Sequence, residues 1–145
     1  MSTPGIDVPG LGCGLAVLRD GKLLLYRRVK APEAGCWNIV GGKVDHMERA
    51  IDAARREAEE ESGIVTRNID FLCISEQIIT QERQHWLSLI YVTDDFSGEP
   101  RVMEPEKLPE FGWFALDDLP SPLSRFAADA VDALVRRQPA RNAAS

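Results

Sequence analysis

The sequence predicts an α/β fold in which helices are layered on a mixed β-sheet. Two segments have the apolar spacing of helices, one in the middle of the chain and one near its C-terminus. Short runs rich in β-branched and aromatic residues lie before and between them, separated by turn residues. No repeat, linker or low-complexity tract divides the chain. We therefore expect one domain over residues 1–145, with residues 1–10 and 139–145 flexible.

The first elements are expected to be a β-hairpin and a short strand. Residues 13–19 form an apolar run that ends at an Asp-Gly turn, and residues 22–27 follow as its antiparallel partner. Proline and glycine mark residues 29–35 as a loop. Residues 37–40 then form a short apolar strand that leads into two glycines.

A long helix is expected after this strand. Gly41 and Gly42 free the backbone for close approach to another group. Asp45 and Glu48 have the spacing of a capping box, and Gly63 has the character of a helix C-cap. Between them runs an apolar helical stripe of five residues, namely Ala50, Ile51, Ala53, Ala54 and Ala58.

The second half of the chain is expected to supply more strands and a final helix. Residues 97–100 break the strand pattern, and residues 117–122 form a turn rich in aspartate and proline. Residues 123–137 have helical spacing of apolar side chains. The predicted strands are residues 69–75, 77–80, 86–93 and 111–116.

Composition excludes several classes of protein. The chain has 17 Lys+Arg against 23 Asp+Glu and a net charge of −6, which argues against general affinity for a nucleic acid backbone. Its three cysteines have no CxxC spacing, so neither a disulfide framework nor a zinc site is indicated. No signal peptide pattern and no long apolar run is found, which predicts a cytoplasmic protein that does not enter a membrane.

Three glutamates crowd one face of the predicted central helix. Glu57, Glu60 and Glu61 are spaced i, i+3, i+4, so their carboxylates point into one shared volume. Like charges at this spacing repel unless a cation lies between them. Carboxylate oxygens without a neighbouring histidine or cysteine ligand suit Mg²⁺, with Mn²⁺ as a substitute. The sequence therefore predicts a divalent metal site that acts on phosphates.

The segment from Gly42 to Ile64 fits the pattern Gly-x5-Glu-x7-Arg-Glu-U-x-Glu-Glu-x-Gly-U at every specified position, where U is an apolar residue. The matching residues are Gly42, Glu48, Arg56, Glu57, Ala58, Glu60, Glu61, Gly63 and Ile64. This is the Nudix box, and the chain resembles the Nudix hydrolase family, MutT-like members included. The resemblance implies the Nudix fold, an α/β/α sandwich with a mixed sheet, and a metal-dependent pyrophosphohydrolase.

The resemblance also implies roles for individual residues. The metal ligands would be Glu57, Glu60, Glu61 and the Gly41 carbonyl, and Arg56 would orient a glutamate. Spacing does not identify the general base among the glutamates. Glu57 and Glu60 are candidates within the box. Outside it, the candidate is Glu104, with Glu106 as the alternative, because residues 98–104 look like the loop that delivers a further acidic residue in some members.

Three residues outside the box are candidates for contact with substrate. Arg28, at the end of a predicted strand that leads toward the active loop, could reach phosphates, and Glu104 could contact the substrate as well. The three tryptophans are most simply core residues, but one at the cleft would stack on a nucleobase. Trp37 is the candidate for that role.

The resemblance favours cleavage of a nucleoside or deoxynucleoside triphosphate to the monophosphate and pyrophosphate. The segment 103–107 and the run 111–114 look like those of such members. Cleavage of ADP-ribose or of a nucleotide sugar is the alternative, and a non-catalytic nucleotide-binding module is a hypothesis from another class. A small nucleotide is the expected partner, and a homodimer is plausible by resemblance alone.

Overall fold

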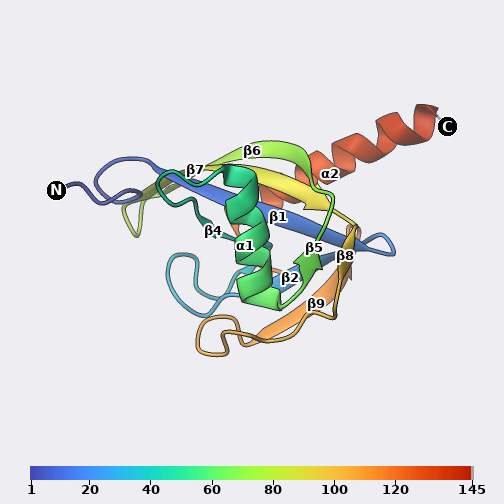
Figure 1. The fold of residues 1–145 in the computed structure, drawn as a ribbon, viewed down its shortest axis with the longest axis horizontal. Coiled ribbons are helices and arrows are strands. Elements are labelled where there is room, and N and C mark those ends of the chain that lie inside the picture. The colour runs from blue at the N-terminus through green and yellow to red at the C-terminus, as the bar shows by residue number, and fades with distance from the viewer. Residues whose placement is uncertain (145) are drawn as a thin grey trace.

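A computed structural model describes the backbone of residues 1–144 and the side chains of residues 1–137. Strands dominate its first two thirds, and the two helices follow a strand-rich segment in each half (Figure 1). The elements in chain order are β1 (Gly10–Arg19), β2 (Lys22–Arg27), β3 (Trp37–Asn38), β4 (Val40–Lys43), α1 (Ala50–Ser62), β5 (Val65–Thr66), β6 (Asp70–Ile79), β7 (Gln84–Thr93), β8 (Phe96–Ser97), β9 (Glu110–Ala115) and α2 (Arg125–Ala144).

The sheet is mixed, as predicted. Its strands follow the order β3-β2-β1-β7-β6, with β4 paired to β1 and β9 paired to β2. β1 runs parallel to β7 over residues 10–17 and antiparallel to β2 and β4. β1 is therefore the strand through which most of the sheet is joined.

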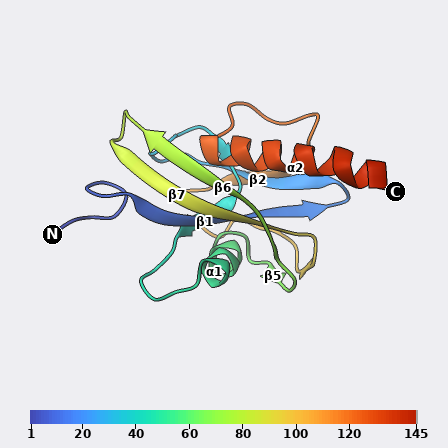
Figure 2. The same cartoon turned by 90° about the horizontal axis from the view of Figure 1, so that it is seen from above.

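The two helices cover opposite faces of this sheet, α1 on one side and α2 on the other (Figure 2). Side chains of β1 alternate between the two layers, since successive residues of a strand point to opposite faces. Leu15 and Val17 lie in the apolar cluster under α1, whereas Ala16 lies in the cluster under α2. Leu24 and Leu25 of β2 divide in the same way. The predicted α/β/α sandwich is confirmed.

Glycines replace side chains on the α2 face of β1. A Cβ atom on Gly10 would lie 2.4 Å from the Trp86 ring, and one on Gly12 would lie 2.4 Å from Ser88 Oγ. At Gly14 it would lie 2.3 Å from the Phe126 ring. The period-two glycines of β1 thus make room for two side chains of β7 and one of α2.

Several predicted boundaries were wrong. The two glycines expected to follow a strand belong to β4, where Gly41 pairs with Gly14 of β1. The two strands predicted over 69–80 form the one strand β6, which contains a bulge between Phe71 and Cys73. The short pair β5 and β8 was not predicted. α2 continues to Ala144, beyond the predicted end at residue 137.

The start of α1 also differs from the prediction. The N-cap is Arg49, with no side chain capping the first turn. Asp45 and Glu48 do contact each other, because the Asp45 N–H donates to the Glu48 carboxylate at 3.1 Å. This contact closes the loop before the helix but does not cap the helix. The Glu48 carboxylate is also bonded to Arg56. Gly63 ends the helix in a left-handed conformation at φ 79°, as predicted.

The residues before β1 form a turn that is bonded to β7. Thr3 to Val8 form a turn in which the Gly5 N–H donates to the Val8 carbonyl at 2.6 Å. The Gly5 carbonyl in turn accepts from the His85 N–H at 2.8 Å. β1 starts at Gly10. The flexibility expected for residues 1–10 and 139–145 stays a prediction, and residue 145 lies outside the described residues.

Candidate active site

The double glycine of β4 lies directly beneath α1. A Cβ atom on Gly42 would come within 2.5 Å of Glu57 Cδ, so only glycine leaves space for this carboxylate. The Glu57 side chain is 15% exposed, and burial raises its pKa while Arg56 opposes that rise. The close approach of β4 and α1 therefore places the mostly buried Glu57 carboxylate against the β4 backbone.

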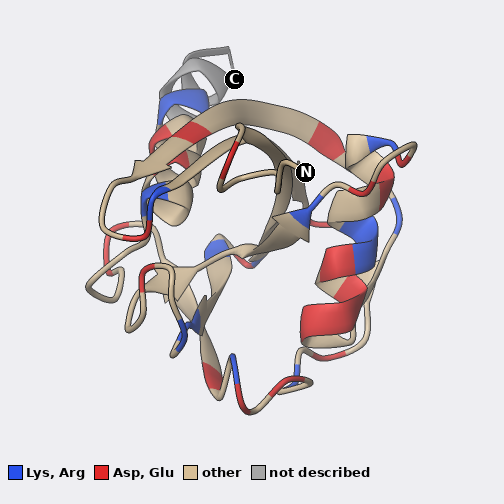
Figure 3. Ribbon diagram, turned by 90° about the vertical axis from the view of Figure 1, so that its left-hand side faces the viewer, with Lys and Arg blue, Asp and Glu red and all other residues tan. Residues whose placement is uncertain are grey.

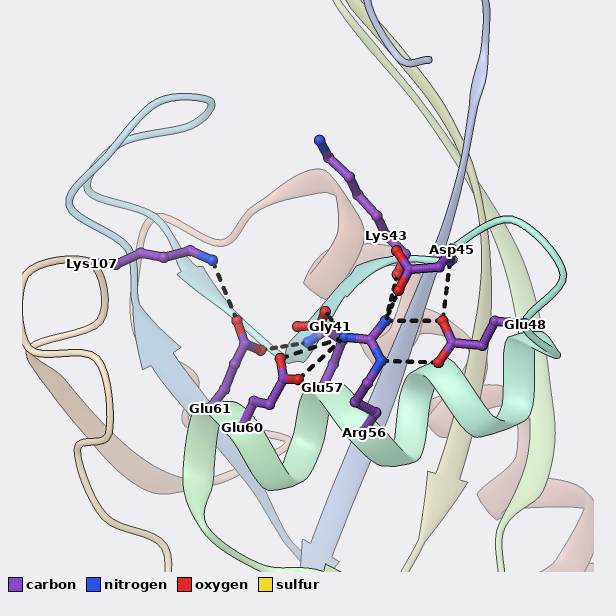
Figure 4. A network of polar contacts seen from close by, with 9 residues as sticks. All are labelled: Gly41, Lys43, Asp45, Glu48, Arg56, Glu57, Glu60, Glu61 and Lys107. Carbon is purple, nitrogen blue, oxygen red and sulfur yellow. Dashed lines mark hydrogen bonds and ion pairs between the residues drawn. The ribbon is translucent and has the colours of Figure 1, made fainter. Parts of the chain in front are cut away.

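Arg56 organises the acidic residues of α1, a helix on which acidic and basic residues gather (Figure 3). Its guanidinium forms two bonds to Glu48, at 2.9 and 3.0 Å. It also donates to Glu57 at 2.9 Å and lies 3.4 Å from Glu60 (Figure 4). A bidentate arginine contact fixes both the position and the orientation of a carboxylate. Arg56 thus joins the loop before α1 to two glutamates of the helix.

These contacts change the acidity of the partners. Hydrogen bonds from Arg56 hold the pKa of Glu48 down at about 2, well below its ordinary value. The same contacts raise the pKa of Arg56 further above its usual value, so the guanidinium stays charged. Glu48 is therefore an anchor for Arg56.

Glu61 is the most buried of the three helix glutamates, at 6% side-chain exposure. One of its oxygens accepts the Gly41 N–H at 2.8 Å, and the other lies 3.7 Å from Lys107 Nζ. Burial is the main cause that raises the pKa of Glu61 to about 8, and the charges of Glu57 and Glu104 add to the rise. The Gly41 N–H and the Lys107 charge lower the pKa of Glu61, but they do not offset the effect of burial.

Glu104 lies close to this group on the loop between β8 and β9. Its Oε1 is buried without a hydrogen-bond partner. The loop is held in place because the Arg101 N–H donates to the Ser62 carbonyl at 3.0 Å and the Tyr26 hydroxyl donates to the Arg101 carbonyl at 2.7 Å. The loop thus brings an unpaired carboxylate oxygen from outside the box to the acidic end of α1.

The donor set suits a hard divalent cation. Among residues 1–137, no three acidic, histidine or cysteine side chains converge closely enough to ligate a metal, because Glu60 turns to Arg56 and Glu61 to Gly41. Two features still favour an ion here: the buried Glu61 carboxylate, whose pKa stays raised although Lys107 lies nearby, and the unpaired oxygen of Glu104. Carboxylate oxygens are ligands that Mg²⁺ prefers.

A cavity of about 430 Å³ opens beside the acidic cluster. At one end it is lined by Gly41, Gly42 and Glu57, with basic groups around it. Its lining also includes residues of the α2 face of the sheet, among them Gly12, Ser88 and Phe126. The remaining lining residues are Cys13, Arg28, Pro32, Glu33, Asn38, Lys43, Asp45, Gln77, Ile79, Gln84, Trp86 and Lys107.

The two other candidates for substrate contact lie in different places. Arg28 lines the cavity, where its guanidinium donates to the carbonyls of Ala31 and Pro32 at 2.8 and 2.7 Å. Trp37 is not among the lining residues, and it packs edge-on against Phe114 with ring centroids 5.2 Å apart. Trp37 therefore has the packing of a core residue.

The cavity residues on the α2 face of the sheet were not predicted from the sequence. Gln77 and Ser88 lie on neighbouring strands, and Trp86 and Phe126 flank them. The available signal was the alternation in β6 and β7, where polar residues occupy positions that a simple sheet would fill with apolar side chains. The three alternating glycines of β1 are the matching signal on the next strand.

Comparison with known proteins identifies the family. The family model described as "NUDIX domain" matches residues 9–134. The solved structure of a MutT NUDIX hydrolase from Burkholderia pseudomallei shares 47% sequence identity, covers 86% of this chain and 97% of its own, and superimposes with a TM-score of 0.84.

Two curated relatives have different substrates in their names. An ADP-ribose pyrophosphatase from Methanocaldococcus jannaschii is 30% identical over 81% of this chain, and an oxidized purine nucleoside triphosphate hydrolase from Danio rerio is 34% identical over 72%. The chain spans 65% of the length of each of these relatives. From the fold, the box geometry and these matches, the chain belongs to the NUDIX domain family.

Proposed function

We propose that the protein is a Mg²⁺-dependent pyrophosphohydrolase that cleaves a nucleoside or deoxynucleoside triphosphate to the monophosphate and pyrophosphate. The observation that carries the proposal is a cavity large enough for a nucleotide that Glu57 lines, next to the buried carboxylate of Glu61, which is bonded to the lining residue Gly41, and to the unpaired oxygen of Glu104. The acidic end suits a metal-bound phosphate chain. The neutral end suits the base.

Glu57, Glu60 and Glu61 would hold the metal, with Gly41 as a backbone contributor. When bound, the divalent ion supplies charge neutralisation of the phosphates and lowers the pKa of a water molecule. Glu104 would accept a proton from the attacking water, since its Oε1 has no competing partner. One water is consumed as its oxygen bonds to phosphorus and the bond to the leaving phosphate oxygen breaks.

The basic groups of the cavity hold the substrate. Lys107, which already faces Glu61, and Arg28 lie where they can contact phosphate oxygens. Arg56 keeps Glu57 in place because it is fixed at its other side by Glu48. A net charge of −6 favours a small nucleotide over a nucleic acid chain. The cytoplasmic location and the homodimer remain predictions.

Cleavage of ADP-ribose is the second candidate. It is favoured by the 30% identity to the ADP-ribose pyrophosphatase from Methanocaldococcus jannaschii. The acidic end of the cavity would act on a pyrophosphate bond in either substrate, so the difference depends on what lies beyond the phosphates. A non-catalytic module is less well supported, because Glu57, Glu60 and Glu61 are all present.

Chromatographic product analysis tests the proposal. The purified protein is incubated with Mg²⁺ and, separately, with the four dNTPs, an oxidised dGTP, ADP-ribose and nucleotide sugars, with EDTA as the control. Release of monophosphate and pyrophosphate from a triphosphate is the expected result. Cleavage of ADP-ribose or sugars alone would replace the proposal by the second candidate, and no turnover with any metal would support the binding module.

A further inference from the structure

A chain of buried hydrogen bonds crosses the α2 layer and ends in the cavity. It begins at Asp129 of α2, whose carboxylate accepts the Ser75 hydroxyl at 2.6 Å. Ser75 Oγ accepts the Gln77 amide N–H at 2.6 Å, and Gln77 Oε1 accepts the Ser88 hydroxyl at 3.1 Å. The three inner residues are at most 5% exposed. Gln77 and Ser88 both line the cavity.

The direction of every bond in this chain follows from its first member. The Asp129 carboxylate accepts the hydrogen bond, so Ser75 donates its single hydrogen to it. Ser75 can then only accept from Gln77, which places the amide nitrogen on the Ser75 side. The amide oxygen consequently faces Ser88, and Ser88 must donate. The Asp129 carboxylate thus fixes the orientation of the Gln77 side-chain amide, which is two hydrogen bonds away.

The fixed direction determines what the cavity offers to a ligand. The second N–H of Gln77 has no place in the chain and remains a donor. Ser88 Oγ has spent its hydrogen on Gln77 and remains an acceptor. The two groups belong to adjacent antiparallel strands. A donor and an acceptor side by side match the polar edge of a nucleobase, which carries an acceptor next to a donor.

The surroundings of this pair are those of a built subsite. Gly12 is required beneath Ser88, because a Cβ atom there would lie 2.4 Å from Ser88 Oγ. Trp86 and Phe126 supply aromatic walls in the same cavity that Glu57 lines. Aromatic side chains beside a fixed polar pair are suited to hold a flat, polar-edged ring.

We propose that Gln77 and Ser88 read the nucleobase edge, and that Asp129 and Ser75 are positioning residues which set this selectivity from the α2 side. The inference rests on the proposed nucleotide substrate. Base selectivity then depends on a hydrogen-bond chain that begins at Asp129. This residue lies on α2, on the other side of the sheet from the acidic residues of α1. If the hydrogen bonds of the chain could run in either direction, the preference for one base should weaken, and phosphate binding should not change.

The test compares variants that disturb different parts of the chain. Gln77→Met removes the amide and keeps the unbranched side chain. Asp129→Asn keeps the shape of the first member, but an asparagine can donate or accept, so either direction of the chain becomes accessible. Asp132→Asn is the matched control, since it removes the same charge from an exposed position of α2. Circular dichroism and thermal melting establish that each variant folds.

Dissociation constants for the four dNMPs and for deoxyribose 5-phosphate, which has no base, are measured by NMR titration in EDTA. The wild type should discriminate among the bases. Gln77→Met should weaken the tightest dNMP by about tenfold, since a lost hydrogen bond in a buried site commonly has that effect. Asp129→Asn should narrow the ratio between the tightest and weakest dNMP, whereas Asp132→Asn should not. Deoxyribose 5-phosphate should bind equally to all four proteins.

Equal affinity of the wild type for all four bases would overturn the inference, as would an unchanged ratio in Asp129→Asn. An equal loss of dNMP and deoxyribose 5-phosphate affinity in Gln77→Met would also contradict it, because the defect would then not concern the base. Binding is measured without turnover. A failure of the proposed triphosphate hydrolysis is therefore seen separately, in the product analysis.

Discussion

The two faces of the sheet bring different chemistry to one cavity. On the α1 face, Gly42 makes room for a carboxylate, and Arg56 holds a set of charged groups around it. On the α2 face, Gly12 makes room for a hydroxyl, and the uncharged side chains of Ser88 and Gln77 are joined in a chain that begins at the Asp129 carboxylate. Glycines open both faces, but a cluster of charged side chains surrounds the glycine on only one. The difference separates a region suited to act on phosphates from a region suited to distinguish what they carry.

The largest effect should come from removing one carboxylate of the charged face. Glu57→Gln should lower kcat/KM by about 1,000-fold, or about 4 kcal/mol of transition-state stabilisation, because a shared metal site loses a ligand. Steady-state kinetics with Mg²⁺ give the value, and circular dichroism should show an intact fold. The matched control is Glu59→Gln on the exposed side of α1, which should leave activity unchanged. Near-normal turnover of Glu57→Gln would remove Glu57 from the metal site.

Replacing the guanidinium should have the next largest effect. Arg56→Lys keeps the charge but cannot hold Glu48 at two atoms while it contacts Glu57. We expect kcat to fall about 100-fold with a smaller change in KM, since the loss concerns the position of a ligand rather than binding of the substrate. Kinetics over a range of Mg²⁺ concentrations check this. An equal fall for Glu48→Gln would support the anchor role of Glu48, and full activity of both variants would contradict it.

The comparison of the two faces is sharpened by a pair of alanine substitutions. In Gly42→Ala the new Cβ would meet Glu57, so kcat should fall about tenfold or more while the melting temperature changes little. In Gly14→Ala the new Cβ would meet the Phe126 ring, so stability should fall by about 1–3 kcal/mol through overpacking of the α2 layer. Chemical denaturation and kinetics on both variants separate the two outcomes. The same defect in both would mean that the faces are not functionally distinct.

A smaller effect is expected from the pH dependence of stability. Burial raises the pKa of Glu61 to about 8, so the folded protein favours its protonated form. The stability that this group contributes is complete below its ordinary pKa and is lost as pH rises from there toward 8. In EDTA, the melting temperature of the wild type should therefore fall over this range more steeply than that of Glu61→Gln. Parallel profiles, measured by differential scanning calorimetry, would show that Glu61 ionises freely.

The charged face could be predicted from the sequence because its parts are neighbours in the chain. Glu57, Glu60 and Glu61 lie within one turn and a half of α1, and helical spacing alone places them together. The start of α1 was harder to predict. Arg49 caps it without a side-chain bond, and the expected partner Glu48 binds Arg56, a contact between residues eight positions apart.

The neutral face could not be predicted in the same way. Asp129, Ser75 and Gln77 come from α2 and β6, and Ser88 from β7, so their contacts depend on the packing of a helix on a sheet. Strand alternation shows that Ser75 and Gln77 share a face, but not that α2 covers it. The continuous strand β6 also went unrecognised: the predicted break fell at residue 76, where Glu76 occupies an exposed position inside the strand. Long-range packing, rather than local pattern, determines this part of the site.

The central claim is that one cavity holds the phosphates against α1 and the base against the α2 face. The most direct measurement is a crystal structure of the Glu57→Gln variant with Mg²⁺ and the dNTP that the wild type prefers, because slow turnover leaves the substrate intact. We predict the triphosphate and metal beside Glu60, Glu61 and Glu104, with the base edge on Gln77 and Ser88. A base bound outside this cavity, with Gln77 and Ser88 still paired only to each other and Ser75, would contradict the account.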